Sequence, residues 1–215
     1  ATRGAALRHS WYDKERRFGV HVAASIKNSE RADLGGSAGD GNWSPDIELF
    51  EDVATLDAKV RYQDFLLGVT FQDRRSSAAT YFPSVGTEWH DQDTLWHIWF
   101  LNTWLKHDWT FLKGYTLSST AYYRNATVAD DSVQQVKDDG QIGYYRPNHL
   151  AGVETRLLAN PWEPLDIVGG LVFENAWLAK GYGKSLSGSA DERPARPAAP
   201  DLASDYLLSV YLQTQ

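Results

Sequence analysis

The sequence contains no cysteine, which excludes disulfide frameworks and sites in which thiolates bind a metal. It also contains no methionine, not even at its first position. We therefore expect the 215 residues to be a processed form or an excerpt of a longer chain, with no signal peptide in view.

Long apolar segments are missing as well. A membrane helix needs about 20 consecutive apolar residues, and the nearest approach, Thr94–Leu105, is too short. An excess of positive charge is also missing, because the net charge is −7. This balance argues against a broad nucleic-acid-binding surface. If the protein meets a bilayer, it does so with strands.

Two runs of alternating apolar residues, joined by a turn, dominate the region Asn148–Trp177. In the second run Leu171 and Phe173 fall on one side, and Glu174 falls on the other. A period of two is typical of a strand, because successive side chains point to opposite faces. The connecting residues Asn160–Pro164 include two prolines and an asparagine, which favour a turn. The region therefore predicts an antiparallel hairpin with one apolar and one charged face.

The same alternation occurs in nine runs along the chain. They cover Thr2–Tyr12, Val20–Ile26, Leu56–Gln63, Phe65–Gln72, Thr94–Lys106, Thr110–Thr127, Ala151–Leu157, Leu165–Glu174 and Tyr206–Gln213. The fifth run is apolar on both sides, so the pattern does not assign its faces. We expect a short turn after it, near His107 and Asp108.

The connections between these runs alternate strictly between short and long. The long ones are Asn28–Val53, Asp73–Asp93, Val128–Pro147 and Ala179–Ser204. In soluble domains most connections have about 4–6 residues. Short turns at one end, long loops at the other and strands of about 10 residues are typical of outer-membrane barrels, as are aromatic residues near the strand ends. We predict an all-β fold, an antiparallel up-and-down transmembrane β-barrel, as part of one domain over residues 1–215.

The number of runs implies that this barrel is incomplete. Bacterial single-chain barrels have even numbers of strands, and two unpaired sheet edges are not stable in lipid. We therefore expect an excerpt of about nine strands, with the remaining strands and any plug domain outside this sequence.

Several stretches carry a resemblance to a known family. They are Arg8–Trp11 through Phe18–Val22, Ala121–Asn125, Asn148–Arg156 and Gly170–Glu174. Together they resemble strands and hairpins in the barrel of TonB-dependent outer-membrane receptors. The resemblance implies a protein of the Gram-negative outer membrane that contacts its lipid. It also implies uptake of a scarce ligand, such as a siderophore or other metal chelate, a vitamin or an oligosaccharide. An inner-membrane complex would energise this uptake through a plug.

The charged sides of the runs predict a water-facing wall. The residues expected to face the lumen are Arg61, Arg124, Glu154, Arg156 and Glu174. They line either a ligand path or a hydrated wall, in which cross-strand pairs contribute about 0.2–1 kcal/mol each. The hydrated wall is the simpler interpretation.

Two clusters in the long segments are candidates for ligand contact, because aromatic and charged residues on loops often bind small molecules. They contain Trp89, His90 and Asp91 in one segment and Tyr144, Tyr145 and Arg146 in another. No ligand spacing supports a metal site at His90, Asp91 and Asp93, and the six histidines form no H-E-x-x-H pair. We predict neither an enzyme nor a cofactor.

Two alternatives remain open. The first is a secreted, soluble β-sandwich that binds glycans through tryptophan-rich loops, and the second is a passive porin. A sandwich would bury Leu171 and Phe173 against a second sheet, whereas a barrel would leave them on its outer surface.

Overall fold

The computed structural model describes residues 1–33, 48–77, 89–90, 94–137, 140–180, 183–187 and 201–214. These residues form eleven strands: β1 (Thr2–Asp13), β2 (Phe18–Asp33), β3 (Glu48–Tyr62), β4 (Phe65–Ser76), β5 (Trp89–His90), β6 (Trp96–Leu112), β7 (Tyr115–Lys137), β8 (Gly140–Trp162), β9 (Leu165–Ala179), β10 (Gly183–Ser187) and β11 (Leu202–Thr214). Nowhere in this described part does a helix occur that is long and apolar enough to span a membrane.

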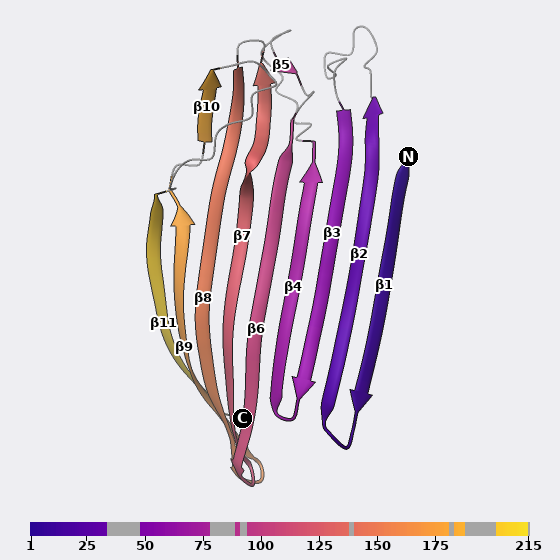
Figure 1. The fold of residues 1–215 in the computed structure, drawn as a ribbon. Helices are drawn as coiled ribbons and strands as arrows, with labels where there is room; N and C mark the ends of the chain where they lie inside the picture. The colour runs from indigo at the N-terminus through magenta and orange to yellow at the C-terminus, as the bar shows by residue number, and fades with distance from the viewer. Residues whose placement is uncertain are drawn as a thin grey trace.

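Nine of the strands form one antiparallel, up-and-down sheet in the order β1-β2-β3-β4-β6-β7-β8-β9-β11 (Figure 1). The short strands β5 and β10 pair with β7 and β8 beside this path. The turns β1–β2, β3–β4, β6–β7 and β8–β9 lie together at one end, here called the turn end. The opposite end is called the loop end. The predicted all-β, up-and-down arrangement is confirmed, as one sheet whose described strands leave β1 and β11 at its edges.

Side-chain alternation explains the register of the central strands. Val60 in β3 lies opposite Val20 in β2 and Leu67 in β4. The next residue, Lys59, points to the other face, opposite His21. A slip of one residue would move the charged side chains onto the apolar face, so the two faces together fix the register.

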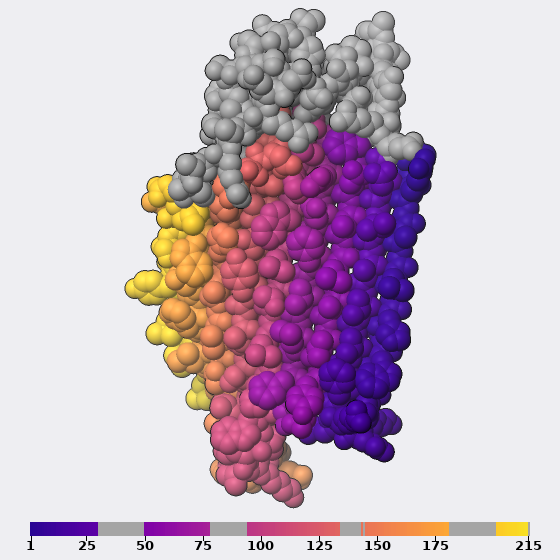
Figure 2. Space-filling model, in the orientation of Figure 1, coloured from indigo at the N-terminus to yellow at the C-terminus, as the bar shows by residue number. Residues whose placement is uncertain are grey.

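The sheet is a single layer with a small core. Its accessible surface is 13,943 Å², against about 10,000 Å² for a compact monomer of 24.2 kDa. In the space-filling view the background is visible between indigo and purple side chains, as in a wall one layer thick (Figure 2). The buried hydrophobic residues of the described part are Leu95, Ala129, Val133, Ala159 and Ala179. All of them except Ala159 lie at the loop end, where Leu95 pairs with Val133 of β7.

The exposure of large apolar side chains decides against the two-layer alternative. Leu171 and Phe173 are each 46% exposed, and the described strands belong to one sheet. The apolar residues are therefore not covered by a second sheet within the described structure, as a β-sandwich requires.

The turn predicted near His107 and Asp108 is wrong. Both residues lie within β6, and the turn is formed by Lys113 and Gly114. Gly114 has a φ of 81°, a left-handed conformation that favours glycine. Trp109 continues the alternation of β6 beyond the predicted turn, because it pairs with Leu117 of β7.

The long connection predicted at Val128–Pro147 is also wrong. Most of these residues extend β7 and β8 as an antiparallel hairpin, in which Lys137 pairs with Gly140. Register shifts interrupt the pairing between Val128 and Ser132 and again before Gln135. Such bulges bend a strand and break its simple alternation, which explains why the sequence pattern read as a loop.

Candidate functional site

The register brings all five residues predicted to face the lumen onto one side of the sheet, here called the polar face. Arg61 and Glu154 belong to one row that crosses the sheet through Leu66, Lys106 and Thr120. Neighbouring rows of the same face contain Arg124, Arg156 and Glu174. The opposite side, the apolar face, carries residues such as Leu67, Leu105, Leu171 and Phe173.

An aromatic ring crosses a glycine in the middle of the polar face. A Cβ atom on Gly152 of β8 would lie 2.5 Å from Cζ of Tyr122, so the ring of this β7 residue lies flat over the glycine backbone. Beyond the glycine, the Tyr122 hydroxyl donates a hydrogen bond to Glu174 of β9. One side chain thus connects three strands, which requires the absence of a side chain at Gly152.

The same contact of a ring with a glycine occurs three more times on this face, once at Gly19, where a Cβ atom would lie 2.7 Å from the Tyr12 ring. A Cβ atom on Gly170 of β9 would lie 2.3 Å from Cζ of Tyr211, whose hydroxyl donates to Glu154 of β8 at 2.8 Å. Trp104 of β6 covers Gly68 of β4, where a Cβ atom would lie 2.3 Å from the indole ring. Aromatic rings that cover strand glycines restore packing that the glycine lacks.

Asp57 is the centre of an ion-pair cluster on the polar face. Its carboxylate lies 3.2 Å from Lys59 Nζ and 3.7 Å from His21 Nε2, and it accepts a hydrogen bond of 3.1 Å from the Thr70 hydroxyl. These groups are partly exposed, so the pairs are screened by water.

A second cluster lies on the polar face toward the loop end. Glu51 accepts a hydrogen bond from Lys27 and pairs with Arg74 at 3.0 Å. The Lys27 hydrogen bond, helped by the charges of Lys27 and Arg74, lowers the pKa of the Glu51 carboxyl against an opposing contribution from burial.

Beside these clusters, from β4 to β9, the polar face is hollowed into a pocket of about 390 Å³. It is lined by Thr70, Gln72, Phe100, Leu101, Asn102, Arg124, Asn125, Ala126, Asn148, His149, Leu150, Ala176 and Leu178. The Arg124 guanidinium lies 5.0 Å from the ring centre of Tyr122, and no carboxylate of the described residues pairs with it. The pocket therefore combines one cation, several amides and apolar walls, which suits a small polar ligand.

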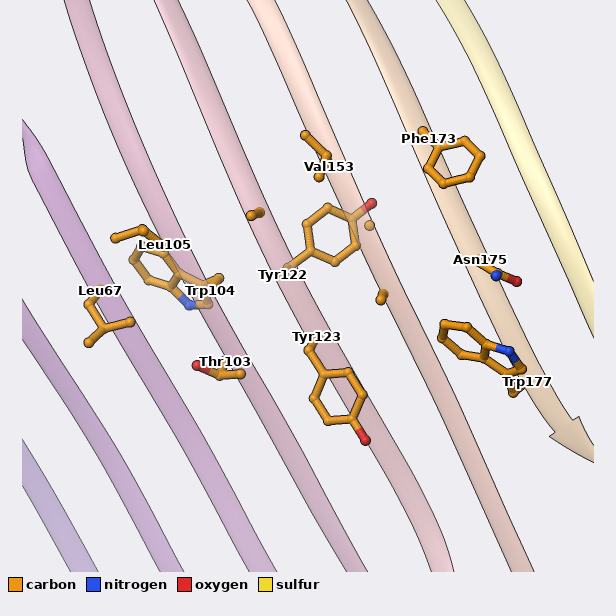
Figure 3. Close-up of a pocket in the computed structure, with 13 residues that line it drawn as sticks. Leu67, Thr103, Trp104, Leu105, Tyr122, Tyr123, Val153, Phe173, Asn175 and Trp177 are labelled. Atoms are coloured by element: carbon orange, nitrogen blue, oxygen red, sulfur yellow. The ribbon is translucent and has the colours of Figure 1, made fainter. Parts of the chain in front are cut away.

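The apolar face has a shallow groove of about 560 Å³ (Figure 3). Its floor is low because Thr103, Ala121 and Ala151 are small, and its sides include Phe173 and Trp177. Most of the residues that line it belong to the apolar face, and Trp104, Tyr122 and Gly152 belong to the polar face. The groove continues the apolar surface and contains no charged group.

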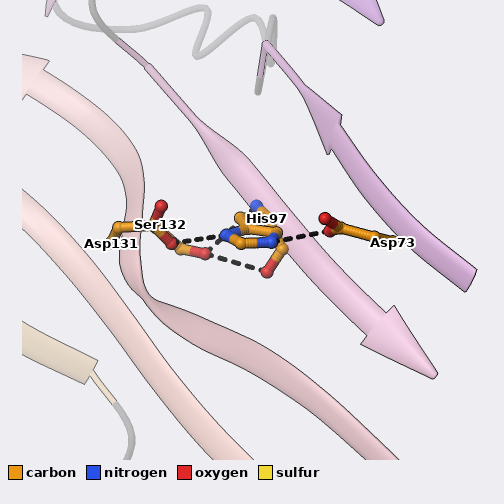
Figure 4. Close-up of polar contacts among 4 residues, drawn as sticks. All are labelled: Asp73, His97, Asp131 and Ser132. Carbon is orange, nitrogen blue, oxygen red and sulfur yellow. Dashed lines mark hydrogen bonds and ion pairs between the residues drawn. The ribbon is translucent and has the colours of Figure 1, made fainter. Parts of the chain in front are cut away.

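A cluster of hydrogen-bonded polar residues lies on the apolar face near the loop end. His97 of β6 has Nε2 2.7 Å from Asp73 and Nδ1 2.7 Å from Asp131 (Figure 4). The fully buried Ser132 accepts from the His97 backbone N–H and donates to its carbonyl, each at 3.1 Å. This cluster fastens β4, β6 and the bent part of β7 to one another.

A second polar group of this kind lies beside the first on β7 and β8. His149 Nδ1 is 2.7 Å from both the Tyr123 hydroxyl and the Asn125 amide nitrogen. The Thr127 hydroxyl donates to the Asn125 side chain at 2.7 Å. These groups satisfy one another, as buried polar groups in proteins generally do.

The first predicted loop cluster is described only by its backbone. Trp89 and His90 form β5, which pairs with Lys137 and Val136 of β7, and their side chains are not among those the structure describes. Asp91 lies outside the described residues. Within the described residues no group of three His, Asp or Glu side chains is arranged to hold a metal ion.

The second predicted cluster does not lie in a loop. Tyr144, Tyr145 and Arg146 belong to β8, where Tyr144 pairs with Ser132 and Arg146 with Val128. Tyr145 is half-buried and Arg146 is exposed, while the side chain of Tyr144 is not described. The extension of β7 and β8 explains the correction, because it converts the predicted loop into a hairpin.

The sequence pattern missed most of the pocket. The alternation does not identify Asn102, because β6 is apolar on both sides and its faces cannot be assigned from the sequence. Glycines inside the strands, such as Gly152 opposite Tyr122, are the sequence signal for the places where aromatic rings cover the polar face. His97 gave no signal, because its partners Asp73 and Asp131 are distant in sequence.

Comparison with known proteins gives no further guide, since no family model, curated protein or solved structure matches this chain.

Proposed function

We propose that this sheet is part of the wall of an outer-membrane β-barrel that takes up a small-molecule ligand in a TonB-dependent manner. In this proposal the apolar face meets lipid and the polar face lines a water-filled lumen. The observation that carries it is a single-layer sheet with one exposed apolar face and one face of charges and amides. Soluble monomers rarely expose apolar patches larger than a few hundred Å².

The length of the apolar stripes supports this orientation. On β2 the stripe runs from Phe18 to Ile26, and on β3 from Ala54 to Tyr62. Each stripe spans nine residues, or about 30 Å of extended strand, and a tilted membrane strand needs about 9–11 residues. The polar pair Asp73 and His97 on the apolar face lies at the loop end of these stripes, where Asp73 pairs with Ala54 and a barrel would leave the bilayer.

The membrane part of the proposal is tested by an adjacent pair of substitutions in β9. Leu171 lies on the apolar face, and Val172 lies on the polar face opposite Glu154. An arginine facing lipid at midplane costs about 2–4 kcal/mol. We expect Leu171→Arg to prevent stable insertion of the full-length protein into vesicles, and Val172→Arg to leave insertion intact. Equal insertion of the two variants would contradict the orientation.

The uptake part is tested in cells. The resemblance to TonB-dependent receptors implies an energised process, whereas a passive porin would not need energy. Cells that express the full-length protein are supplied with radiolabelled cobalamin, a ferric hydroxamate or a maltooligosaccharide, with and without a protonophore. Accumulation that stops with the protonophore supports the receptor, while accumulation that persists indicates a passive pore. In the receptor the inner-membrane complex acts through a plug that is separate from this sheet.

A further inference from the structure

The pocket on the polar face is made by two adjacent rows of side chains that cross five strands. One row is Thr70, Asn102, Arg124, Leu150 and Ala176, and the other is Gln72, Phe100, Ala126, Asn148 and Leu178. Two of these ten residues, Ala126 and Ala176, are small, which leaves room between the larger side chains. β4, β6, β7, β8 and β9 each contribute one residue to each row, so the pocket depends on the register of the sheet.

The charge of the pocket selects an anion. Arg124 is the only Asp, Glu, Lys or Arg among its lining residues. Its guanidinium lies over the Tyr122 ring at 5.0 Å, which orients the side chain. Among the described residues no carboxylate lies within ion-pair distance of the guanidinium. A planar guanidinium with free N–H groups matches a carboxylate by two parallel hydrogen bonds.

The remaining lining defines the rest of the ligand. Gln72 and Asn102 are half-buried, and no hydrogen bond within the described residues occupies their amides. Phe100 and Leu178 are 44% and 47% exposed, so their apolar surfaces are available to a ligand. Leu150 lies beside Arg124 in the same row. The lining therefore offers an apolar surface next to the cation, with amides at the margin.

We propose that this pocket binds small monocarboxylates with a flat apolar body, the carboxylate on Arg124 and the ring against Phe100 and Leu150. The inference deepens the proposed function and rests on it, because it names the chemical class of ligand that the wall recognises. A volume of about 390 Å³ is within the usual range for small-molecule sites and holds a two-ring acid.

The test measures binding of 2-naphthoate and of its neutral analogue 2-naphthamide to the full-length protein in detergent micelles, by titration calorimetry. We expect the wild type to bind naphthoate at least tenfold more tightly than naphthamide. Arg124→Gln removes the charge but keeps hydrogen-bonding groups, and we expect it to abolish that preference. Arg61→Gln is the matched control, because Arg61 is an exposed arginine of the same face outside the pocket.

Equal affinity of the wild type for the two compounds, or an equal loss in Arg61→Gln, would overturn the proposal. If Arg124→Gln does not fold, Asn102→Leu is tested in its place. We expect this variant to bind naphthoate several-fold more weakly, and unchanged affinity would contradict the pocket. The outcome is separate from that of the Leu171→Arg and Val172→Arg pair. If naphthoate binds more tightly than naphthamide but the Leu171→Arg and Val172→Arg variants insert equally well, only the membrane orientation is refuted. If the two variants insert differently but the two compounds bind equally, only the pocket is refuted.

Discussion

Replacing Gly170 with alanine should separate the contribution of the ring–glycine contacts from that of strand propensity. In β9, Gly170 faces Tyr211 and its neighbour Gly169 faces the opposite side of the sheet. A Cβ atom at Gly170 would lie 2.3 Å from Cζ and 2.4 Å from the hydroxyl oxygen of Tyr211, whereas ordinary contacts begin at 3.4 Å. The ring must therefore move by about 1 Å or more, since Cβ atoms do not tolerate such contacts.

The expected loss follows from what the displaced ring gives up. The Tyr211 hydroxyl donates to Glu154 at 2.8 Å. A hydrogen bond to a charged group contributes about 1.5–3 kcal/mol when buried, and partial exposure reduces this to about 1 kcal/mol. Loss of the ring's packing adds to it, while alanine in place of glycine returns about 0.5–1 kcal/mol through chain entropy. We expect Gly170→Ala to destabilise the protein by about 1–2 kcal/mol.

Two controls make the result specific. At Gly169 a Cβ atom would lie 3.5 Å from the nearest atom, a side-chain carbon of Leu212, so Gly169→Ala should be neutral or slightly stabilising. In a Tyr211→Ala background the clash is absent, and Gly170→Ala should then stabilise by about 0.5–1 kcal/mol. The sign of the same substitution therefore reverses between the two backgrounds.

The assay is equilibrium urea unfolding of the full-length protein in lipid vesicles, followed by tryptophan fluorescence. The double-mutant cycle should give a coupling of about 2 kcal/mol between positions 170 and 211. If Gly170→Ala and Gly169→Ala have the same stability, or if the coupling is near zero, the ring does not depend on the glycine and the reasoning fails.

Two further predictions concern the loop end. Replacing His97 with leucine removes both 2.7 Å contacts to Asp73 and Asp131. The local free energy of opening should then fall by about 1–3 kcal/mol, so backbone amides of β6 and β7 near the loop end should exchange their hydrogens faster. Unchanged hydrogen exchange would show that the cluster does not hold these strands together. Glu51 has a folded-state pKa below its ordinary 4.5, so the stability it contributes is present above pH 4.5 and disappears as the pH falls through the lowered pKa. We expect the free energy of unfolding of Glu51→Gln to differ from that of the wild type by less than about 1 kcal/mol at pH 7. This difference in stability should vanish in acid, and a difference that grows in acid would refute the assignment.

The sequence predicted the two faces correctly wherever strands are regular. The alternation placed Arg61, Arg124 and Glu154 on one face because a two-residue period leaves no other arrangement in a paired strand. It failed where that period is disturbed. Bulges after Val128 made an extended hairpin resemble a loop, and the turn lies at Lys113 and Gly114, not near His107 and Asp108.

The sequence by itself determined that this chain forms antiparallel strands with an apolar and a charged side, because that information is local and repeats with every second residue. Only the tertiary structure decided which residues become neighbours across strands. Tyr122 reaches Glu174 over Gly152, and Arg124 shares a pocket with Gln72, because register rather than distance in sequence sets these contacts. Contacts between side chains of different strands depend on how several strands are aligned, so the sequence of a single strand does not reveal them.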